Sequence, residues 1–292
     1  MDIGKIGLWA FLDMLPAGPS QDAAKEIEDL GFKALWIPEA IGREIFTSSA
    51  ILLAGSRCLV IATGIANIWA RDAMAMMNAQ RTLTEAYPDR FLLGMGVSHA
   101  PLVDAVRGHL YTKPLTYMRT YLDAMDAAPF AAAQPTTPLT RVIAALHPKM
   151  LKLAAERSAG SHPYFVPPEH TKRARELLGP DALLAPEQGV CLETDPEKAR
   201  RIARSHMAMY LTLPNYRRNL ESLGFGAAEF ENGGSDRLVD AIVAWGDMDA
   251  IRERVRRHHE AGANHVCLQV LTEEMMWSPP RKEWRELAKA LL

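Results

Sequence analysis

Cysteine is scarce in this chain of 292 residues, and the three that it has, Cys58, Cys191 and Cys267, are far apart. Three isolated thiols form neither a disulfide framework nor a set of zinc ligands, and they suit a reducing compartment. An excess of one charge is also missing, because 33 Lys and Arg residues stand against 35 Asp and Glu residues. Without a basic surplus to neutralise phosphates, a nucleic acid is not an expected partner.

Long apolar runs are absent as well. No stretch approaches the roughly 18 residues of a membrane-spanning segment, and the opening residues 1–5 do not begin a signal peptide. We therefore expect a soluble, cytoplasmic protein without a membrane partner. The apolar content of 48% is ordinary for a folded chain, so it excludes disorder and allows a large core.

Short apolar runs alternate with amphipathic segments along almost the whole chain. Such runs are typical of buried strands, and we expect eight of them, at 6–11, 33–37, 59–65, 91–96, 141–146, 162–166, 188–192 and 265–270. The helices expected between and after them include 20–30, 47–56, 72–86, 116–127, 168–178, 195–211, 235–245, 247–261 and 281–292.

Three helix starts carry local signals. Ser20 is a good N-cap residue, and Pro148 stands at the favoured first position of a helix. Thr194 and Glu197 have the spacing of a capping box, in which each satisfies a free N–H group of the other.

Strands that alternate with helices predict parallel pairing through right-handed crossovers. The near-continuous apolar strands predict that both faces of the sheet are buried. A single (β/α)8 TIM barrel over 1–292 meets these conditions, with an inserted loop after the fourth strand and extra helices before the eighth. A doubly wound open sheet is the alternative, but the end of its first strand would carry a glycine-rich turn that is missing here.

In a barrel, functional residues follow the carboxyl ends of the strands. Glu39 follows the second strand and can hydrogen-bond a heterocyclic ligand or move a proton, although a solvated loop acid has the same pattern. His99 follows the fourth strand and suits proton transfer near neutral pH, unless it is a surface histidine of a mobile loop. His147 follows the fifth strand and either takes part in the chemistry or only caps the next helix.

Two glycine-containing segments are candidate ligand contacts. Gly94 and Gly96 allow close approach of the backbone to a flat ligand, or simply tight strand packing. Ala159, Gly160 and Ser161 offer N–H groups and a hydroxyl to a phosphate, or form an ordinary loop. His258 and His259 lie among arginines in a helix and indicate a solvated face, so no metal site is expected.

Four segments resemble a known family. They are GKIGLW at 4–9, LGFKALWIPE at 30–39, DRFLLGMGVSH at 89–99 and LAAERSAG at 153–160. With them the chain resembles the luciferase-like monooxygenase superfamily, and within it the branch that uses 8-hydroxy-5-deazaflavin (coenzyme F-420) in place of FMN. The resemblance implies a (β/α)8 barrel whose open end is covered by a flat redox ring.

The resemblance also assigns roles to individual residues. It implies a bulge with a cis peptide at Gly64 and Ile65 against one ring face, with Asn67 near the ring, Gly96 and Val97 at its edge, and Ala159, Gly160 and Ser161 around the phosphate. The resemblance also implies that Glu39 contacts the cofactor. Ala40 and His99 stand where the family often has histidine and glutamate, so His99 is the expected proton donor and His147 its reserve.

These observations together predict an oxidoreductase. It would transfer a hydride between the deazaflavin and a small, largely apolar organic substrate, while the loop 97–118 covers the site. Two alternatives remain: an FMN-dependent monooxygenase, and a barrel that binds flavin without turnover. A metal-dependent hydrolase is a third alternative, but the sequence offers no set of metal ligands for it. A homodimer is expected only because dimers are common in the family that the chain resembles.

Overall fold

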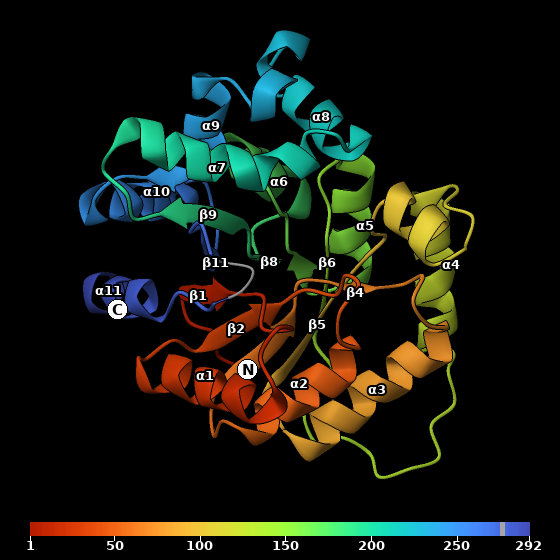
Figure 1. Cartoon of the computed structure of the whole chain (residues 1–292). Helices are drawn as coiled ribbons and strands as arrows, with labels where there is room; N and C mark the ends of the chain where they lie inside the picture. Colours follow the sequence, from red (N-terminus) through yellow and green to blue (C-terminus); the bar gives the residue numbers. More distant parts are fainter. Residues whose placement is uncertain (275–277) are drawn as a thin grey trace.

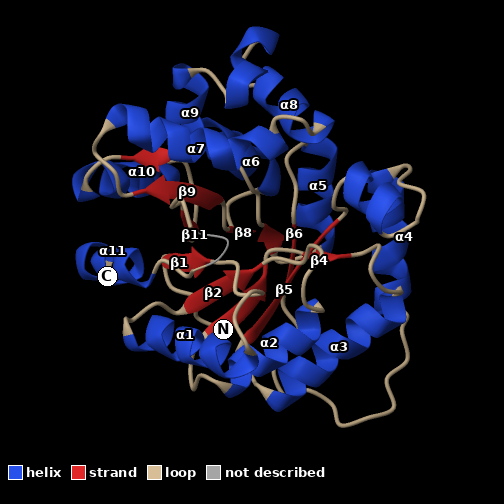
Figure 2. Cartoon of the chain, viewed as in Figure 1, coloured by secondary structure: helices blue, strands red, loops and turns tan. Residues whose placement is uncertain are grey.

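In a computed structural model that describes residues 1–274 and 278–292, parallel strands occupy the centre and helices surround them (Figure 1, Figure 2). The strands are β1 (Ile6–Trp9), β2 (Ala34–Ile37), β3 (Val60–Thr63), β4 (Ala66–Asn67), β5 (Phe91–Gly96), β6 (Arg141–Ile143), β7 (Gly160–Ser161), β8 (Leu183–Leu184), β9 (Glu187–Cys191), β10 (Ala244–Trp245) and β11 (Val266–Val270). Hydrogen bonds connect them in the order β10-β9-β11-β1-β2-β3-β5-β6-β7-β8, with β4 on β5.

One bent segment, residues 183–191, closes this sheet. Its first part, β8, pairs with β7, and its second part, β9, pairs with β11. Near the bend, the backbone N–H of Glu187 donates to Pro163 on one side (2.8 Å), and Pro186 accepts from Cys267 on the other (2.9 Å). The segment therefore acts as the seventh of eight barrel strands, and the expected (β/α)8 barrel is confirmed.

The helices that cover the barrel follow the strands in turn. They are α1 (Ala17–Asp29), α2 (Ile45–Ala54), α3 (Ala73–Ala86), α4 (Pro114–Asp126), α5 (Pro148–Arg157), α6 (Pro168–Leu178), α7 (Pro196–Tyr210), α8 (Pro214–Glu221), α9 (Asp236–Ile242), α10 (Met248–Glu260) and α11 (Arg281–Leu291). A short π-helix, η1 (Pro101–Val106), follows β5, and a 3-10 helix, η2 (Ala227–Gly233), lies between α8 and α9.

The sixth strand differs from the prediction. It runs over Gly160–Ser161 instead of 162–166, and β8 was not expected. A Cβ on Gly160 would lie 1.8 Å from the carbonyl oxygen of Leu183, so only glycine allows this close pairing. Pro163 has no N–H for a ladder, and Phe165 has a φ of 61°, so the strand ends before them.

Two caps and one helix face were also predicted wrongly. Ser20 lies inside α1, where its hydroxyl donates to Pro16, and Asp195 instead of Thr194 accepts the N–H of Lys198 at the start of α7. His258 is fully buried between Thr171 and Gln188 and does not belong to a solvated face. The prediction that Pro148 opens a helix is confirmed.

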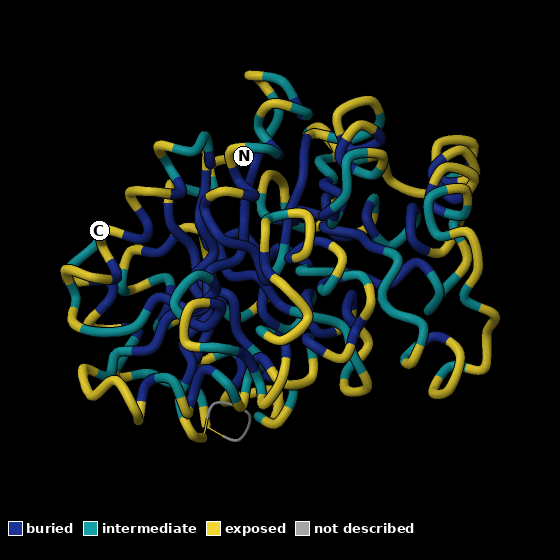
Figure 3. Tube along the Cα trace, turned by 90° about the horizontal axis from the view of Figure 1, so that it is seen from above, coloured by how far each residue is buried: buried dark blue, intermediate teal, exposed yellow. Residues whose placement is uncertain are grey.

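The interior of the barrel is filled by side chains. Buried strand residues inside it include Trp9, Trp36, Ala62, Leu92, Val142, Ala185 and Cys267, and the strands form the dark centre of Figure 3. Trp36 stacks on His162 with ring centroids 4.2 Å apart. Because the lumen is packed, a ligand has to be bound at an end of the barrel. Of the described helices, none is long and apolar enough to cross a membrane.

Candidate functional site

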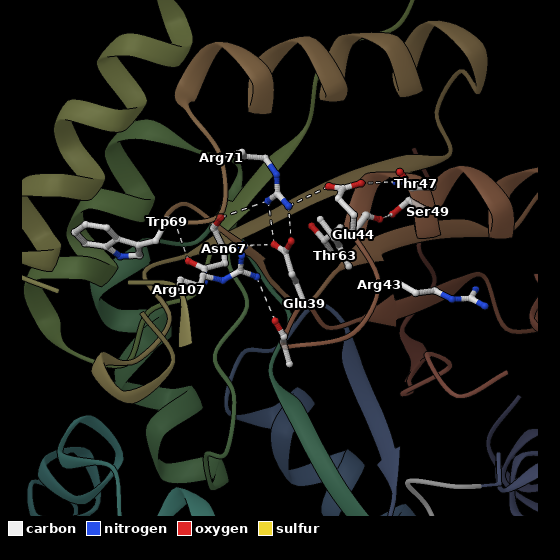
Figure 4. Close-up of polar contacts among 12 residues, drawn as sticks. Glu39, Arg43, Glu44, Thr47, Ser49, Thr63, Asn67, Trp69, Arg71 and Arg107 are labelled. Carbon is white, nitrogen blue, oxygen red and sulfur yellow. Dashed lines mark hydrogen bonds and ion pairs between the residues drawn. The ribbon is translucent and has the colours of Figure 1, made fainter. Parts of the chain in front are cut away.

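The parallel strands all finish at the same end of the barrel, and we call this end the mouth. The first feature there is a buried ion pair. Glu39, just after β2, accepts hydrogen bonds from both terminal nitrogens of Arg71, one of them at 2.9 Å. The side chains of Glu39 and Arg71 are only 3% and 11% exposed, and Figure 4 shows them facing each other.

This pair also fixes the backbone beyond β3. Glu39 accepts the N–H of Asn67 (2.8 Å), and Arg71 donates to the carbonyl of Asn67 (3.3 Å). Arg71 further contacts Glu44 (3.0 Å). Both carboxylate oxygens of Glu39 are therefore in use, and the structure places Glu39 as a residue that positions Asn67.

The predicted ring contacts come together beside this pair. The peptide between Gly64 and Ile65 is cis, as the resemblance implied. Asn67 pairs with Gly96 across β4 and β5, and a Cβ on Gly96 would lie 2.9 Å from Ile65. The backbone of residues 64–67 and of Gly96 thus forms one continuous edge of the mouth, which continues into Val97.

Three buried donors at this edge have no partner among residues 1–274 and 278–292. They are Nδ2 of Asn67, Nε1 of Trp69 and Nε of Arg107. Asn67 and Arg107 are bonded to the loop around Glu39, since Glu39 accepts the N–H of Asn67 and Arg107 donates to Ala40 (3.2 Å). The Trp69 indole instead stacks on Tyr117, with ring centroids 3.8 Å apart, and points away from Glu39 (Figure 4). Buried polar atoms are rarely left unpaired, so a ligand with acceptor atoms would complete the group.

His99 lies at the mouth on the segment after β5. Its ring is 5.1 Å from the ring of Tyr216, and burial lowers its pKa to about 4. His99 is therefore neutral at pH 7, when an imidazole can accept a proton or donate its remaining N–H in a hydrogen bond. It is not an imidazolium acid in this arrangement.

The segment 97–113 carries both His99 and Arg107. It contains η1, whose Val103 is buried, and its Tyr111 hydroxyl donates to Ser98 (3.3 Å). Arg107 ties it to the loop after β2 through Ala40. The segment 97–113, which is most of the loop 97–118 predicted to cover the site, is thus attached to the end of β2, two strands away in the sheet.

His147, the reserve proton donor of the prediction, has another contact. Its Nε2 lies 3.2 Å from the backbone oxygen of Asn215 on α8. Because that oxygen only accepts, Nε2 carries the hydrogen. His147 therefore holds α8, and with it Tyr216, over the mouth.

Ala159, Gly160 and Ser161 lie in the wall of the barrel, just before and within β7. Ala159 donates to Arg141, the first residue of β6, and the Ser161 hydroxyl donates to Ile143 (2.8 Å). Ala159 lines an outer cavity of about 440 Å³ whose arginines, Arg141 and Arg157, are paired with aspartates. These hydrogen bonds within the barrel wall engage the N–H of Ala159 and the hydroxyl of Ser161, two of the groups predicted to hold the phosphate.

A group of residues at the mouth was missed by sequence reasoning. It consists of Tyr164 after β7, Glu187 on β9, Tyr210 at the end of α7, Tyr216 on α8 and Gln269 on β11. Tyrosines in helices are ordinary, and Glu187 was left outside the predicted strand 188–192. The one signal in the sequence that could have indicated Glu187 is the position of a charged residue directly before an apolar strand.

A second cavity, of about 280 Å³, lies outside the barrel and is lined in part by Phe225, Arg237 and Arg254.

Comparison with known proteins identifies a family, a relative and two solved structures. A model of the luciferase-like monooxygenase family matches residues 16–265. A protein of Mycobacterium tuberculosis, named as a candidate coenzyme F-420-dependent oxidoreductase, is 30% identical over 122 residues, which are 41% of this chain. The match spans 33% of that relative's length.

Solved structures with the same fold cover nearly the whole chain. An F-420-dependent secondary alcohol dehydrogenase, solved with an F-420–acetone adduct, superposes with a TM-score of 0.78 at 15% identity and covers 98% of both chains. The oxygenating constituent of a diketocamphane monooxygenase from Pseudomonas putida, solved with FMN, superposes with a TM-score of 0.69 at 13% identity, over 98% of this chain and 97% of the other.

Proposed function

The chain belongs to the luciferase-like monooxygenase family, and on this premise we propose that it is an oxidoreductase that binds coenzyme F-420 at the barrel mouth and exchanges a hydride with a small organic substrate. The named relative and the alcohol dehydrogenase support this choice within the family. The observation that carries it is the pair of unpartnered buried donors on Asn67 and Arg107.

The residues at the mouth fit this group. The pyrimidine edge of a deazaflavin presents two carbonyl oxygens and N1 as acceptors for the free donors at the mouth, whereas its N3–H donates. A Cβ on Gly64 would lie 2.8 Å from Trp9, and one on Gly96 would lie 2.9 Å from Ile65, so both glycines keep the backbone of this edge closely packed. The ion pair of Glu39 and Arg71 holds Asn67 in place, so the donors are positioned before any ligand arrives.

When bound, the deazaflavin supplies two-electron hydride chemistry, because a carbon replaces the flavin N5. The protein's own part is to bind, orient and exclude water. His99 is neutral and stands at the mouth, so it can accept the proton that leaves a substrate oxygen. The segment 97–113, fastened by Arg107, keeps water from the reacting atoms.

Side-by-side calorimetric titrations with the oxidised deazaflavin and with FMN test this proposal. We expect the deazaflavin to bind more tightly than FMN. Asn67→Ala should weaken deazaflavin binding about tenfold, since it removes one donor, and a tenfold change corresponds to about 1.4 kcal/mol. The matched control, Asn78→Ala on α3, should leave binding unchanged. Tight binding of FMN with none of the deazaflavin would overturn the proposal.

An FMN-dependent monooxygenase is the second candidate. The superposition on the FMN-bound monooxygenase favours it, because the same donors suit the pyrimidine edge of either ring. Oxygen consumption with reduced FMN distinguishes the two. We expect none above that of FMN alone.

A further inference from the structure

A second polar group lies at the mouth, next to the predicted ring edge. Trp9, at the end of β1, contacts both regions. Its Nε1 donates to the Gly64 carbonyl (3.2 Å), and its ring centroid is 5.3 Å from that of Tyr164. Whatever binds beside Tyr164 is therefore separated from the Gly64 edge by a single indole ring.

The hydroxyl of Tyr164 belongs to a short hydrogen-bonded chain. Tyr164 donates to Oε1 of Gln269 (2.7 Å), and its oxygen lies 2.9 Å from the Tyr210 hydroxyl. A hydroxyl has one hydrogen, so Tyr210 must donate to Tyr164, and the Tyr210 oxygen keeps a free lone pair. If the Gln269 amide turns over, the chain reverses, and Tyr210 then has a hydrogen to donate.

Glu187 lies in the barrel strand beside Gln269 and is 2% exposed. Its Oε2 accepts the N–H of Phe165 (3.0 Å), while Oε1 has no partner in the described part of the chain. A Cβ on Gly189 would lie 3.7 Å from Oε1 and 3.3 Å from Leu271, so the glycine lies directly beside this oxygen. Glu187 is thus a buried polar group with one atom free.

The surroundings of Glu187 hold it in the neutral form. Burial raises its pKa to about 8, and the hydrogen bond from Phe165 opposes this only in part. The titratable groups that sense its charge are Tyr164, Tyr210, Tyr216 and Cys267, none of which is a cation. At pH 7 Glu187 therefore carries a proton that it can donate.

The walls around these groups are aromatic and uncharged. The Tyr210 ring lies 5.4 Å from Tyr216 and 5.1 Å from His206. Burial lowers the pKa of His206 to about 4, as it does for His99, so both rings are neutral at pH 7. A charged substrate would meet no opposite charge here, whereas a neutral oxygen would meet both donors and acceptors.

We propose that Glu187, Gln269 and the hydroxyls of Tyr164 and Tyr210 form a substrate subsite that selects an uncharged alcohol or ketone. The Glu187 carboxyl donates to the substrate oxygen, and the tyrosine chain accepts from an alcohol or, when reversed, donates to a ketone. The subsite thus suits both redox states of one carbon–oxygen group. This proposal rests on the proposed function, and it names the substrate class of that function.

Infrared difference spectroscopy tests the carboxyl directly. At pH 7 we expect a protonated-carboxyl band in the wild type that Glu187→Gln removes and that the matched surface variant Glu197→Gln retains. Thermal unfolding checks that Glu187→Gln is folded. With the deazaflavin bound, saturating cyclohexanol or cyclohexanone should shift the band. No such band, or a band that neither compound shifts while the deazaflavin binds, overturns the subsite.

Binding of the same probes tests the substrate class. Tyr210→Phe should weaken the binding of cyclohexanol about tenfold, whereas Tyr87→Phe, a tyrosine outside the mouth, should not change it. Cyclohexanecarboxylate should bind at least tenfold more weakly than cyclohexanone. Equal binding of the charged probe would contradict the subsite. A band that responds to cyclohexanone in a protein that binds no deazaflavin would instead contradict the proposed function and leave the subsite standing.

Discussion

Removing the cation of the buried ion pair is the most informative perturbation of the fold near the mouth. In Arg71→Met, Glu39 would keep the N–H of Asn67 but lose both guanidinium contacts. Its side chain is 3% exposed, so water cannot replace them. Breaking such a pair from one side typically costs about 3–5 kcal/mol, because it leaves a buried charge without compensation.

A double-mutant cycle separates this cost from other losses. Glu39→Gln leaves Arg71 with its half-exposed partner Glu44, and we expect about 1–3 kcal/mol of destabilisation. The double variant Glu39→Gln/Arg71→Met buries no charge, so it should be more stable than Arg71→Met alone. Arg252→Met, which breaks an exposed pair with Asp249, is the control and should cost at most about 1 kcal/mol.

Urea unfolding followed by circular dichroism measures all four variants. We expect a coupling energy of about 2 kcal/mol or more between Glu39 and Arg71. Calorimetry on the same proteins should show weaker deazaflavin binding wherever Asn67 loses its support. If the two substitutions lower the free energy of unfolding additively, or if Arg71→Met lowers it by less than about 1 kcal/mol, the reasoning that this pair is buried and holds the site is refuted.

Three further predictions concern other elements of the mouth. The raised pKa of Glu187 means that the folded state holds an extra proton between pH 4.5 and about 8, so this group's contribution to stability is lost as pH rises through that window. Relative to Glu187→Gln, the wild type should lose up to about 1.4 kcal/mol per pH unit from pH 5 to 8 in urea unfolding, and a flat difference would contradict the protonated carboxyl. His147→Ala should destabilise the protein by about 1 kcal/mol and speed amide hydrogen exchange in α8, because His147 anchors this helix through Asn215. Unchanged exchange in α8 would show that the contact is unimportant. Arg107→Ala should raise the dissociation rate of the deazaflavin severalfold in stopped-flow measurements while leaving the urea midpoint nearly unchanged, and an unaltered rate would exclude the segment 97–113 as a cover.

The barrel could be predicted because its signals are repeated. Strands such as Phe91–Gly96 are buried along their whole length, and helix starts such as Pro148 carry their own local chemistry. The short strands could not be found in this way. Gly160 and Ser161 carry no apolar pattern, and their pairing depends on a close approach to Leu183 that exists only after folding.

The candidate site also combines residues that the sequence indicates with contacts that form only after folding. Gly64, Asn67 and Gly96 were identified through the resemblance, and the structure brings them to one edge. The partner of Glu39 was not identified, because Arg71 comes 32 residues later, after the neighbouring strand β3, and meets Glu39 only in the folded barrel. His258 was misjudged since a helix stripe of Ile251, Val255 and His258 faces inward despite the arginines between them.

A crystal structure of the protein with the oxidised deazaflavin tests the central claim most directly. The account predicts the ring at the mouth, with its pyrimidine edge hydrogen-bonded by Asn67 or Arg107 and its plane against Gly64 and Ile65. A ring bound elsewhere, or those donors left unpaired in the complex, would contradict it.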